Sequence, residues 1–307
     1  APTRRRSDTL PQFPAVAAGD EDLTGVVREL RPVMGRGGFG PRDPNEPDVR
    51  WLLESGVVAL GRMLLDHRDN LDTFAYDKAN AILGGVTLAE VMAAFAELAR
   101  ERGVDPGAAN KARLRKYWIS ALLYQRDLLR YLFRPAFYAT RMAEVGDQLP
   151  ALLSMTFGEL VGHLSVTETD DAQGVLISRL QLGLLAAFPR EPQIQQLAAA
   201  QYDAQCAAWA QVYRVISAAY RVTIGDGSAE TFDDMALLFS LVVEGAHLRR
   251  VVDPAEGLLT RGDHVATRII QLLLADLSGR PWEELAQLRA DQHSLTSTDR
   301  PALADQH

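Results

Sequence analysis

The most concentrated chemistry in the sequence is a run of basic side chains between residues 110 and 118. Four cations fall within two helical turns, after an asparagine that can cap a helix: Asn110, Lys111, Arg113, Arg115 and Lys116. Arg and Lys neutralise phosphates, and Arg also binds guanine through two parallel hydrogen bonds. From Arg100 to Lys116 there are six basic residues against Glu101 and Asp105, on a chain of formal net charge −8. A solvated basic face on an ordinary helix is the alternative, and this stretch alone leaves both open.

The segment before the basic run predicts the element that must hold it in place. Thr87 followed three residues later by Glu90 is a capping-box pattern. Apolar residues then recur at helical spacing, which predicts a helix over Leu88–Arg102 with one apolar stripe. Gly103 stands in the position where a left-handed backbone ends a helix most easily. We therefore expect a capped helix of defined length ahead of the cations.

A turn and a second, short helix follow. The residues Asp105-Pro106-Gly107 are typical of a turn, and the second helix is expected to begin near Asn110. Leu114 and Trp118 would face the first helix, which leaves the cations on the outside. A helix, a turn and a basic second helix are typical of a DNA-reading helix-turn-helix.

Composition limits the classes of protein to consider. With 307 residues, 47% hydrophobic and 23% charged, the chain is expected to form one or two soluble globular domains. The acidic balance argues against binding nucleic acid over the whole surface and leaves room for one basic face. Cys206 is the single cysteine, so an internal disulfide and a cysteine-rich zinc site are excluded, and we expect it to be a small core residue. No apolar run of membrane-spanning length and no signal-peptide pattern is found, so a cytoplasmic location is expected.

The first 48 residues differ from the rest. They are rich in proline and glycine, which predicts an extended or partly disordered arm over 1–48, with one possible short helix around Glu21–Leu30. The GRGGFG segment, Gly35–Gly40, is a weak match to a phosphate loop, because no strand precedes it and no GK[ST] follows. Arg4-Arg5-Arg6 is either a solvated terminus or an arm that contacts DNA. Residues 291–307 are expected to form a disordered tail.

From Val49 onward the periodicity is helical almost everywhere, and no alternating strand pattern of useful length is found. We therefore predict an all-α fold, with a helix-turn-helix DNA-binding domain at 49–134 and a helical ligand-binding and dimerisation domain at 135–290. Pro135 and Gly146 are expected bend and break points. Beyond the motif, helices are predicted at Trp51–His67, Leu71–Leu83, Pro150–Val166, Asp171–Ala187, Gln193–Val222, Phe232–Val252, Gly262–Leu277 and Pro281–Ala290.

The stretch from Thr87 to Trp118, with the SALLYQRDLL that follows, resembles the DNA-binding end of the TetR/AcrR family of transcriptional regulators. That family has a threonine-capped helix, a Gly-Val-x-x-Gly turn and a short helix ending in an aromatic pair, here Tyr117-Trp118. Phe232–Pro254 is similar to the penultimate helix of the family's ligand-binding domain, and HVATRIIQLLLADL is similar to the last one. The chain departs from the family pattern in a first helix about two turns longer, in extra residues before Tyr117 and in its N-terminal extension.

The resemblance implies a homodimeric transcriptional regulator, with repression as the expected output, that binds operator DNA and senses a small molecule. The last two helices of the family usually form a four-helix dimer interface, and the expected contacts here are Leu237, Leu238, Leu241, Val242, Ile269, Ile270 and Leu273. The expected DNA-binding residues are Thr87, Asn110, Lys111, Arg113, Arg115, Lys116 and Tyr117. The alternative is a regulator on the same scaffold that binds proteins or ligands and does not touch DNA.

An apolar effector cavity is expected between segments that carry large apolar residues on more than one face: Leu152–Phe157, Leu176–Phe188 and Trp209–Tyr220. The expected ligand-binding residues are Phe157, Trp209, Tyr213 and Tyr220. Such a set at helical spacing is also typical of ordinary core, so both interpretations stay open.

Enzymatic and metal-binding alternatives have less support. Glu244 with His247 forms an E-x-x-H, and Glu159 lies one turn from His163, so a carboxylate metal site in a helical bundle is conceivable. Such a site needs two matched E-x-x-H motifs and two further glutamates, and only one such motif is present. No Ser-His-Asp set or paired carboxylates are found, so we expect no catalytic residues, no metal and no cofactor.

Overall fold

The computed structural model describes residues 22–35, 38–66, 86–103, 105, 107, 109–170, 172–252, 259–260 and 263–291. Within these residues the fold is mostly helical, as predicted, and the named strands form two short antiparallel hairpins. The chain divides into two compact units. The first extends to Arg134 and includes Leu180–Leu197, and the second comprises Pro135–Arg179 and continues from Ala198.

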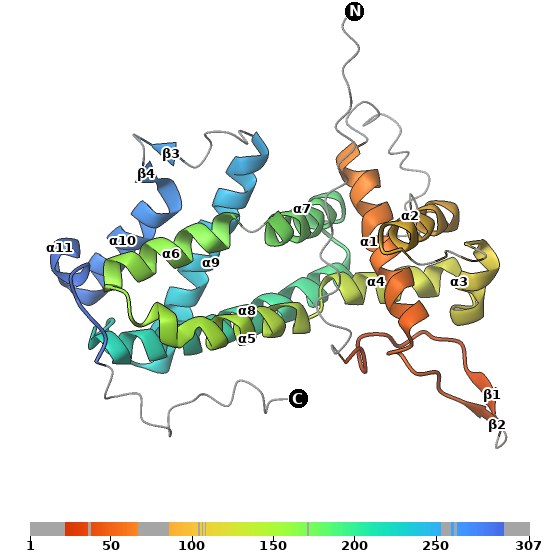
Figure 1. The fold of residues 1–307 in the computed structure, drawn as a ribbon, viewed down its shortest axis with the longest axis horizontal. Helices are drawn as coiled ribbons and strands as arrows, with labels where there is room; N and C mark the ends of the chain where they lie inside the picture. Colours follow the sequence, from red (N-terminus) through yellow and green to blue (C-terminus); the bar gives the residue numbers. More distant parts are fainter. Residues whose placement is uncertain are drawn as a thin grey trace, which may run out of the picture. The chain divides into compact units, whose positions relative to one another are not determined.

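Helices α1 to α4 form the body of the first unit. They are α1 (Pro47–Asp66), α2 (Leu88–Glu101), α3 (Lys111–Tyr117) and α4 (Ala121–Leu132), and α1 packs against both α2 and α4 (Figure 1). The predicted helix at Leu71–Leu83 lies outside the described residues. The contact between α1 and α4 is close at Gly56, where a Cβ atom would lie 2.8 Å from a methyl carbon of Leu128. The Tyr124 hydroxyl donates to the carbonyl oxygen of Leu52 at 2.7 Å and fixes the same crossing.

The capping signals of the helix-turn-helix segment are confirmed. The Thr87 hydroxyl accepts from the Glu90 amide at 3.2 Å, and the Glu90 carboxylate accepts from the Thr87 amide at 2.7 Å, which completes the predicted capping box. Gly103 has a φ of 67° and follows the last turn of α2. Asn110 caps α3 by accepting from the amide of Ala112 at 2.9 Å. Local chemistry therefore sets both ends of the turn.

The described part of the N-terminal segment, expected to be an extended or partly disordered arm, is packed on the helices. Residues 22–30 contain a turn and no helix, so the short helix expected around Glu21–Leu30 is wrong there. Leu23 is fully buried, and the Arg31 amide donates to the carbonyl oxygen of Tyr117 at 2.7 Å. The glycine-rich stretch forms an antiparallel hairpin of β1 (Val33–Gly35) and β2 (Gly38–Gly40), with Met34 opposite Phe39.

The second unit is built from longer helices. They are α5 (Ala136–Leu152), α6 (Phe157–Asp170), α7 (Ala172–Ala187), α8 (Pro192–Tyr220), α9 (Ala229–Val252), α10 (Val265–Ser278) and α11 (Trp282–Leu285), with a small hairpin of β3 (Leu259–Thr260) and β4 (Asp263–His264). By sequence, α7 and α8 each run through parts of both units. α5 continues through Gly146 and contains Pro150, so a break at Gly146 and a helix start at Pro150 are both wrong.

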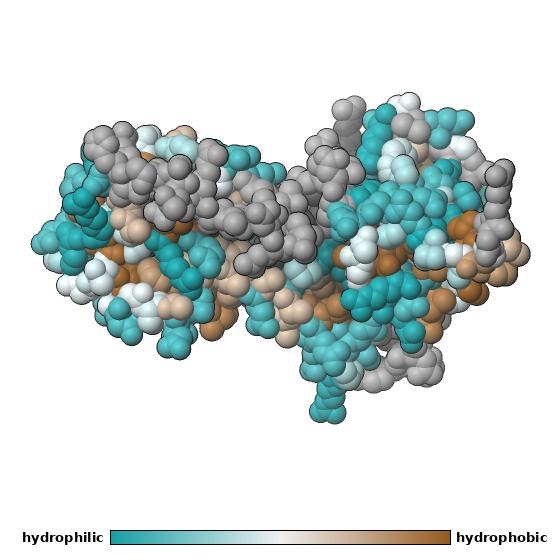
Figure 2. Space-filling model, turned by 90° about the horizontal axis from the view of Figure 1, so that it is seen from below, coloured by the Kyte–Doolittle hydropathy of each residue, from teal (hydrophilic) through white to brown (hydrophobic). Residues whose placement is uncertain are grey.

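The core of the second unit lies between α6, α8, α9 and α10. α6 packs on α9 and α10, and α9 packs on α10. On the face drawn in Figure 2, hydrophobic residues reach the surface in several places among hydrophilic ones. None of the helices in the described ranges combines the length and the apolar character needed to cross a bilayer.

Candidate nucleic-acid interface and ligand pocket

The inner face of α3 is attached to α1 and α2 by a small set of directed contacts. Leu114 is fully buried and Tyr117 nearly so. The Tyr117 hydroxyl donates to Asp48 of α1 at 2.8 Å, and Arg113 forms an ion pair with the same carboxylate at 2.7 Å. The Arg113 guanidinium also lies 4.6 Å from the ring centre of Phe95 of α2. Two of the residues expected to bind DNA, Arg113 and Tyr117, therefore hold α3 to its own unit.

Asp48 is the acceptor at the centre of this attachment. Burial by itself would raise the pKa of Asp48, but the hydrogen bonds from Arg113 and Tyr117 outweigh it and hold the pKa below its usual value. Burial and the Asp48 carboxylate together raise the pKa of Tyr117, so this hydroxyl stays protonated and donates. The sequence patterns gave no reason to select Asp48, because an acid in the first turn of a helix is ordinarily explained by the helix dipole.

The outer face of α3 presents cations. Lys111, Arg115 and Lys116 are exposed, and Lys111 and Arg115 lie one helical turn apart on the same face. The Lys116 amine donates to the Tyr117 hydroxyl at 3.2 Å, so it lies close to the protein surface. Thr87 and Asn110 are exposed but act as helix caps. Of the seven residues expected to bind DNA, three are exposed cations on α3.

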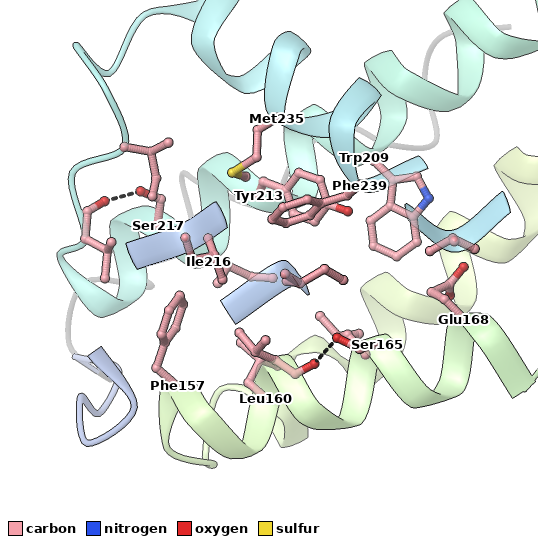
Figure 3. A pocket seen from close by; sticks show the side chains of 17 residues that line it. Phe157, Leu160, Ser165, Glu168, Trp209, Tyr213, Ile216, Ser217, Met235 and Phe239 are labelled. Atoms are coloured by element: carbon pink, nitrogen blue, oxygen red, sulfur yellow. Dashed lines mark hydrogen bonds between the residues drawn. The ribbon is translucent and has the colours of Figure 1, made fainter. Parts of the chain in front are cut away.

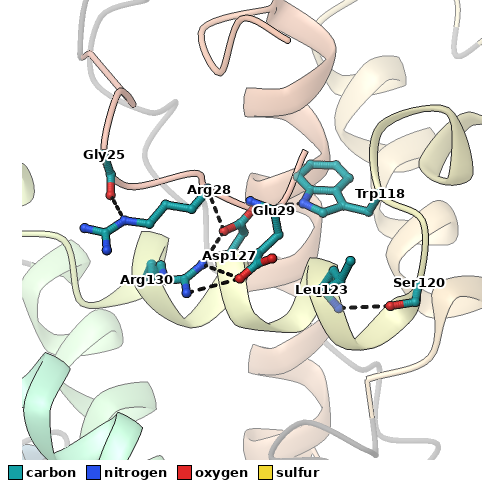
Figure 4. Close-up of polar contacts among 8 residues, drawn as sticks. All are labelled: Gly25, Arg28, Glu29, Trp118, Ser120, Leu123, Asp127 and Arg130. Atoms are coloured by element: carbon teal, nitrogen blue, oxygen red, sulfur yellow. Dashed lines mark hydrogen bonds and ion pairs between the residues drawn. The ribbon is translucent and has the colours of Figure 1, made fainter. Parts of the chain in front are cut away.

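α4 and the N-terminal segment meet at a buried carboxylate of α4, Asp127 (Figure 4). It accepts from the indole nitrogen of Trp118 at 2.9 Å and from the backbone amides of Arg28 and Glu29 at 2.9 and 3.0 Å. Arg130 completes the set with an ion pair of 2.8 Å. Trp118, placed by sequence on the second helix, is the residue that ends α3, and its buried ring anchors the turn into α4.

Large apolar side chains are exposed beside the C-terminal end of α3. Ile119, two residues after Tyr117, is 65% exposed, and Leu122 is also exposed. The hairpin β1–β2 follows Arg31, whose amide is bound to Tyr117, and its Phe39 is 74% exposed. The surface around α3 is thus cationic on the helix and apolar at its C-terminal end.

A pocket lies inside the second unit, between α6, α8, α9 and α10 (Figure 3). It encloses about 650 Å³ not filled by protein atoms, part of which is open to solvent. The centre of a water molecule can occupy about 70 Å³ of this space. That volume is several times the minimum needed to hold one water molecule. The lining residues are Phe157, Leu160, Val161, Leu164, Ser165, Glu168, Trp209, Tyr213, Ile216, Ser217, Val222, Ile224, Met235, Phe239, Val243, Ile270 and Leu274.

Three of the four residues expected to bind a ligand line this pocket: Phe157, Trp209 and Tyr213. Tyr220 does not. Its ring packs on Phe157 with centres 5.1 Å apart, and its hydroxyl donates to the carbonyl oxygen of Met155 at 3.0 Å. The expected boundary at Leu176–Phe188 is also wrong, because no residue of α7 is among the described lining residues. The pocket is lined there by residues of α6 instead: Leu160, Val161 and Leu164. Their helical spacing in the sequence was the signal that could have identified them.

Few polar groups face the pocket. The hydroxyl of Ser165 donates to the carbonyl oxygen of Val161, and that of Ser217 donates to Val222. Burial raises the pKa of Tyr213 well above its usual value, and the nearby Glu168 carboxylate raises it further, so this phenol stays protonated. Glu168 is only partly buried. The remaining lining is apolar or aromatic, as in sites for small organic molecules.

The metal-site candidates are not assembled. Nowhere in the described ranges do three or more His, Cys, Asp or Glu residues come together as metal ligands do. His247 instead contacts the backbone oxygen of Glu168 through its Nε2 atom at 3.0 Å. Burial raises the pKa of Glu244. Glu159 accepts from both the amide and the hydroxyl of Thr156, which is a helix-capping role.

The helices expected to form a dimer interface present apolar side chains to solvent. On α9 these are Leu237, Leu238, Leu241 and Leu248, and on α10 they are Ile269 and Leu272. Leu241 is 56% exposed and Leu272 is 62% exposed. Three expected contacts face inward instead, because Ile270 is buried in the core and Val242 and Leu273 pack against it.

Comparison with known proteins gave no match: no family model, no curated protein and no solved structure matches this chain. The likeness to the TetR/AcrR family therefore stays a prediction from the sequence. The function has to be inferred from the chemistry of α3 and of the pocket.

Proposed function

We propose that the protein is a DNA-binding transcriptional regulator, with repression as its expected output, whose binding to an operator is modulated by a small, mainly apolar effector. The observation that carries this proposal is the division of α3 into two faces. Leu114, Arg113 and Tyr117 attach the helix to α1 and α2, while Lys111, Arg115 and Lys116 are exposed. A rigidly held, short helix with an outer cationic face is what contact with a duplex requires.

The proposed DNA-contacting set is therefore Lys111, Arg115 and Lys116, with Asn110 at the start of the helix. Arg113 and Tyr117 contribute without contacting DNA, because they fix the orientation of α3 through Asp48. Thr87 also contributes indirectly, by capping α2. A contact helix held in one orientation loses less entropy on binding, which favours affinity.

The pocket in the second unit is the proposed effector site. Its lining is contributed by four helices and by Val222 and Ile224 of the segment between α8 and α9, so a bound molecule would change the packing of all four helices. α8 belongs partly to the first unit by sequence and carries Trp209, Tyr213 and Ile216 of the pocket. Effector binding would shift the population towards a state in which the contact helices no longer fit the operator.

The proposed active form is a homodimer joined through α9 and α10. The exposed leucines on these two packed helices support it, since contiguous apolar surface on a protein marks an interaction site. Two identical subunits would present two contact helices to successive major grooves. Replacing Leu241 and Leu272 together by Glu is expected to yield monomers, measured by size exclusion with light scattering. Ile119→Glu, a matched change at another exposed apolar position, should leave the dimer intact, and a dimer that survives the double change places the interface elsewhere.

The direct test of DNA binding is a salt titration with duplex fragments of the protein's own promoter region. Each phosphate contact contributes about 0.9 to the slope of log affinity against log salt concentration. The double variant Lys111→Ala, Arg115→Ala is expected to lower that slope by about 1 for each phosphate contact removed. If Arg115 binds a base instead, its loss should cost about 1–3 kcal/mol and relax sequence preference.

Arg190→Ala provides the control, because Arg190 is an exposed cation outside the α2–α3 segment. It should leave both the affinity and the slope unchanged. A wild-type protein without salt-dependent affinity for any duplex would contradict the proposal, as would a double variant that binds like the wild type.

A second candidate is a regulator that acts through protein contacts, and a specific observation favours it. Ile119, Leu122, Met34 and Phe39 are exposed beside α3, and large apolar side chains of this kind are common at protein interfaces. The same titration separates the two candidates. Loss of binding on Ile119→Ser with Leu122→Ser, in the absence of duplex affinity, would identify a protein surface.

A further inference from the structure

The hairpin β1–β2 is attached to the first unit at its base. Before β1, the Arg31 amide donates to the carbonyl oxygen of Tyr117, the last residue of α3, at 2.7 Å. After β2, the Arg42 guanidinium lies 4.5 Å from the ring centre of Tyr117 and forms an ion pair with Glu46 at 3.2 Å. Both segments that lead into the hairpin are therefore fixed at the C-terminal end of α3. In Figure 1 the hairpin projects away from the helices of this unit.

The hairpin leaves two large apolar side chains in solvent. Met34 and Phe39 are directly opposite each other in the antiparallel register, so both side chains lie on one face of the ribbon. They are 66% and 74% exposed. A two-stranded hairpin is marginally stable by itself, and exposed apolar side chains add little to its stability. The pair is therefore better explained by a partner that buries it.

The rest of the ribbon is short and narrow. Glycine occupies positions 35, 38 and 40 of the two strands. Gly38 has a φ of 108°, which requires glycine. Gly40 has no positive φ, and a Cβ atom placed on it would meet nothing within 4 Å, so the fold does not require this glycine. Glycine also lets a backbone approach a ligand closely. A thin ribbon with two bulky apolar side chains is suited to insertion into a groove.

The charge of the hairpin and its surroundings indicates the kind of partner. From Leu30 to Arg42 the sequence contains three arginines and no acidic residue. Arg31 is exposed, and the hairpin is attached to the helix that carries the three exposed cations described above. The next acid along the chain, Asp43, accepts from the Asn45 amide at 2.8 Å. Cations combined with apolar wedges are typical of proteins that bind the DNA minor groove, where Phe or Met is inserted between base steps.

The length of the hairpin fits such a contact. The extended chain from Arg31 to Met34 spans about 10 Å, and half of α3 adds about 5 Å. A duplex repeats every 34–36 Å or so, so the centres of a major groove and the next minor groove lie roughly 17 Å apart along its axis. With the side chain of Phe39 added, the hairpin is long enough to reach the minor groove while α3 lies in the major groove.

We propose that the hairpin β1–β2 is a second DNA-contacting element, which enters the minor groove next to the site of α3 and inserts Met34 and Phe39 between base pairs. This inference rests on the proposed function, because it adds a contact to the same duplex. Arg31 lies at the base of the hairpin and contacts the phosphates at the edge of the groove. Wedges of this kind unstack a base step and bend the duplex by about 20–90°.

The test uses the duplex fragment of the promoter region that binds most tightly, labelled at both ends for fluorescence resonance energy transfer. The full-length wild-type protein is expected to bring the two ends closer together. The double variant Met34→Ala, Phe39→Ala should bind at least tenfold more weakly, and the bend should be lost. The slope of log affinity against log salt concentration should fall by less than about 1, because this variant keeps every cation.

Two further variants make the result specific. Phe39→Leu keeps an apolar wedge and should keep the bend, which separates insertion from a loss of hairpin structure. Ile119→Ala with Leu122→Ala is the matched control, since it removes two other exposed apolar side chains of the same unit. It should leave affinity and bend unchanged. The bend of the wild-type complex needs no variant, so it decides the question even if the double variant fails to fold.

The outcomes separate this inference from the proposed function. A wild-type complex without a bend overturns the insertion and leaves α3 as the DNA contact. A double variant that binds and bends the duplex like the wild type does the same, and assigns Met34 and Phe39 to the protein surface of the second candidate. An equal loss in the matched control also overturns the role of the hairpin. No salt-dependent affinity for any duplex overturns both this inference and the proposed function.

Discussion

The attachment of α3 and the pocket of the second unit differ in their chemistry. Hydrogen bonds and ion pairs hold α3, whereas apolar and aromatic side chains line the pocket. Around α3, Asp48 and Asp127 each collect several hydrogen bonds from different segments, so the elements are held in one arrangement. The pocket is lined mostly by apolar and aromatic groups that leave space unfilled. Hydrogen bonds and ion pairs fix direction, whereas apolar contacts are non-directional and tolerate rearrangement.

This difference indicates which of the two regions can change its packing. A helix that presents cations to a partner gains from rigidity. Two carboxylates that each accept from several segments supply it, Asp127 fully buried and Asp48 partly buried. A site that admits a ligand must instead be able to repack, and a flexible side chain such as Met235 allows that. Three substitutions test the contrast, from the largest expected effect to the smallest.

Asp127→Ala is expected to have the largest effect. The change leaves the Trp118 indole, the amides of Arg28 and Glu29 and the Arg130 guanidinium without their buried acceptor. Breaking a buried ion pair by removing one partner costs about 3–5 kcal/mol. The free energy of unfolding is measured by urea denaturation. Glu101→Ala, at an exposed acid of α2, should change it by less than about 0.5 kcal/mol, and a similar small cost for Asp127→Ala would refute the directional attachment.

Asp48→Asn is expected to cost about 1–3 kcal/mol, the range for loss of hydrogen bonds to a charged group. The pKa of Asp48 is lowered in the folded state from a usual value of 3.8. Ionised Asp48 therefore contributes its full stabilisation above that value, and the contribution is lost as the pH falls through the lower, folded pKa. The difference in Tm between wild type and Asp48→Asn should be constant from pH 7 to about pH 5 and shrink below pH 4. A difference that instead grows with falling pH would contradict the assigned role.

Ile216→Val should have the smallest effect. An Ile→Val change costs about 0.5–1.5 kcal/mol, and the low end is expected here because unfilled space already adjoins Ile216. Ile194→Val is the matched change at a fully buried position of the first unit and should cost more. The two variants are compared by urea denaturation on the same day and buffer. Equal costs would mean that the pocket is as tightly packed as the rest of the protein.

Local signals in the sequence predicted the helix-turn-helix segment closely. Thr87, Glu90, Gly103 and Asn110 act on backbone groups within a few residues, so their roles follow from the sequence itself. The helical periodicity also predicted most of the later helices. Pro150 misled the prediction of a helix start, because the α5 chain on both sides remains helical in spite of it. The folded state of residues 22–31 could not be predicted, since it depends on Asp127, about a hundred residues away.

In the candidate sites, too, some features could be predicted from the sequence and others depend on contacts between distant segments. The cations of α3 were identified from their types and spacing, but the sequence could not tell that Arg113 and Tyr117 turn inward, because that depends on Asp48 of α1. Phe157, Trp209 and Tyr213 were selected as large aromatics, whereas Glu168 was not selected at all. Its place in the pocket lining depends on the helices that surround it, and a carboxylate in an isolated helix gives no sign of the apolar chamber beside it.

The sequence by itself determined the helical class, the capped helix, turn and basic helix, and the apolar surface of the last two long helices. These properties arise from interactions between residues close together in the chain. Tertiary structure decided which cations on α3 face outward, which carboxylates hold it, and where the unfilled space in the second unit lies. These properties depend on contacts between residues far apart in sequence, which become defined only when the helices pack together.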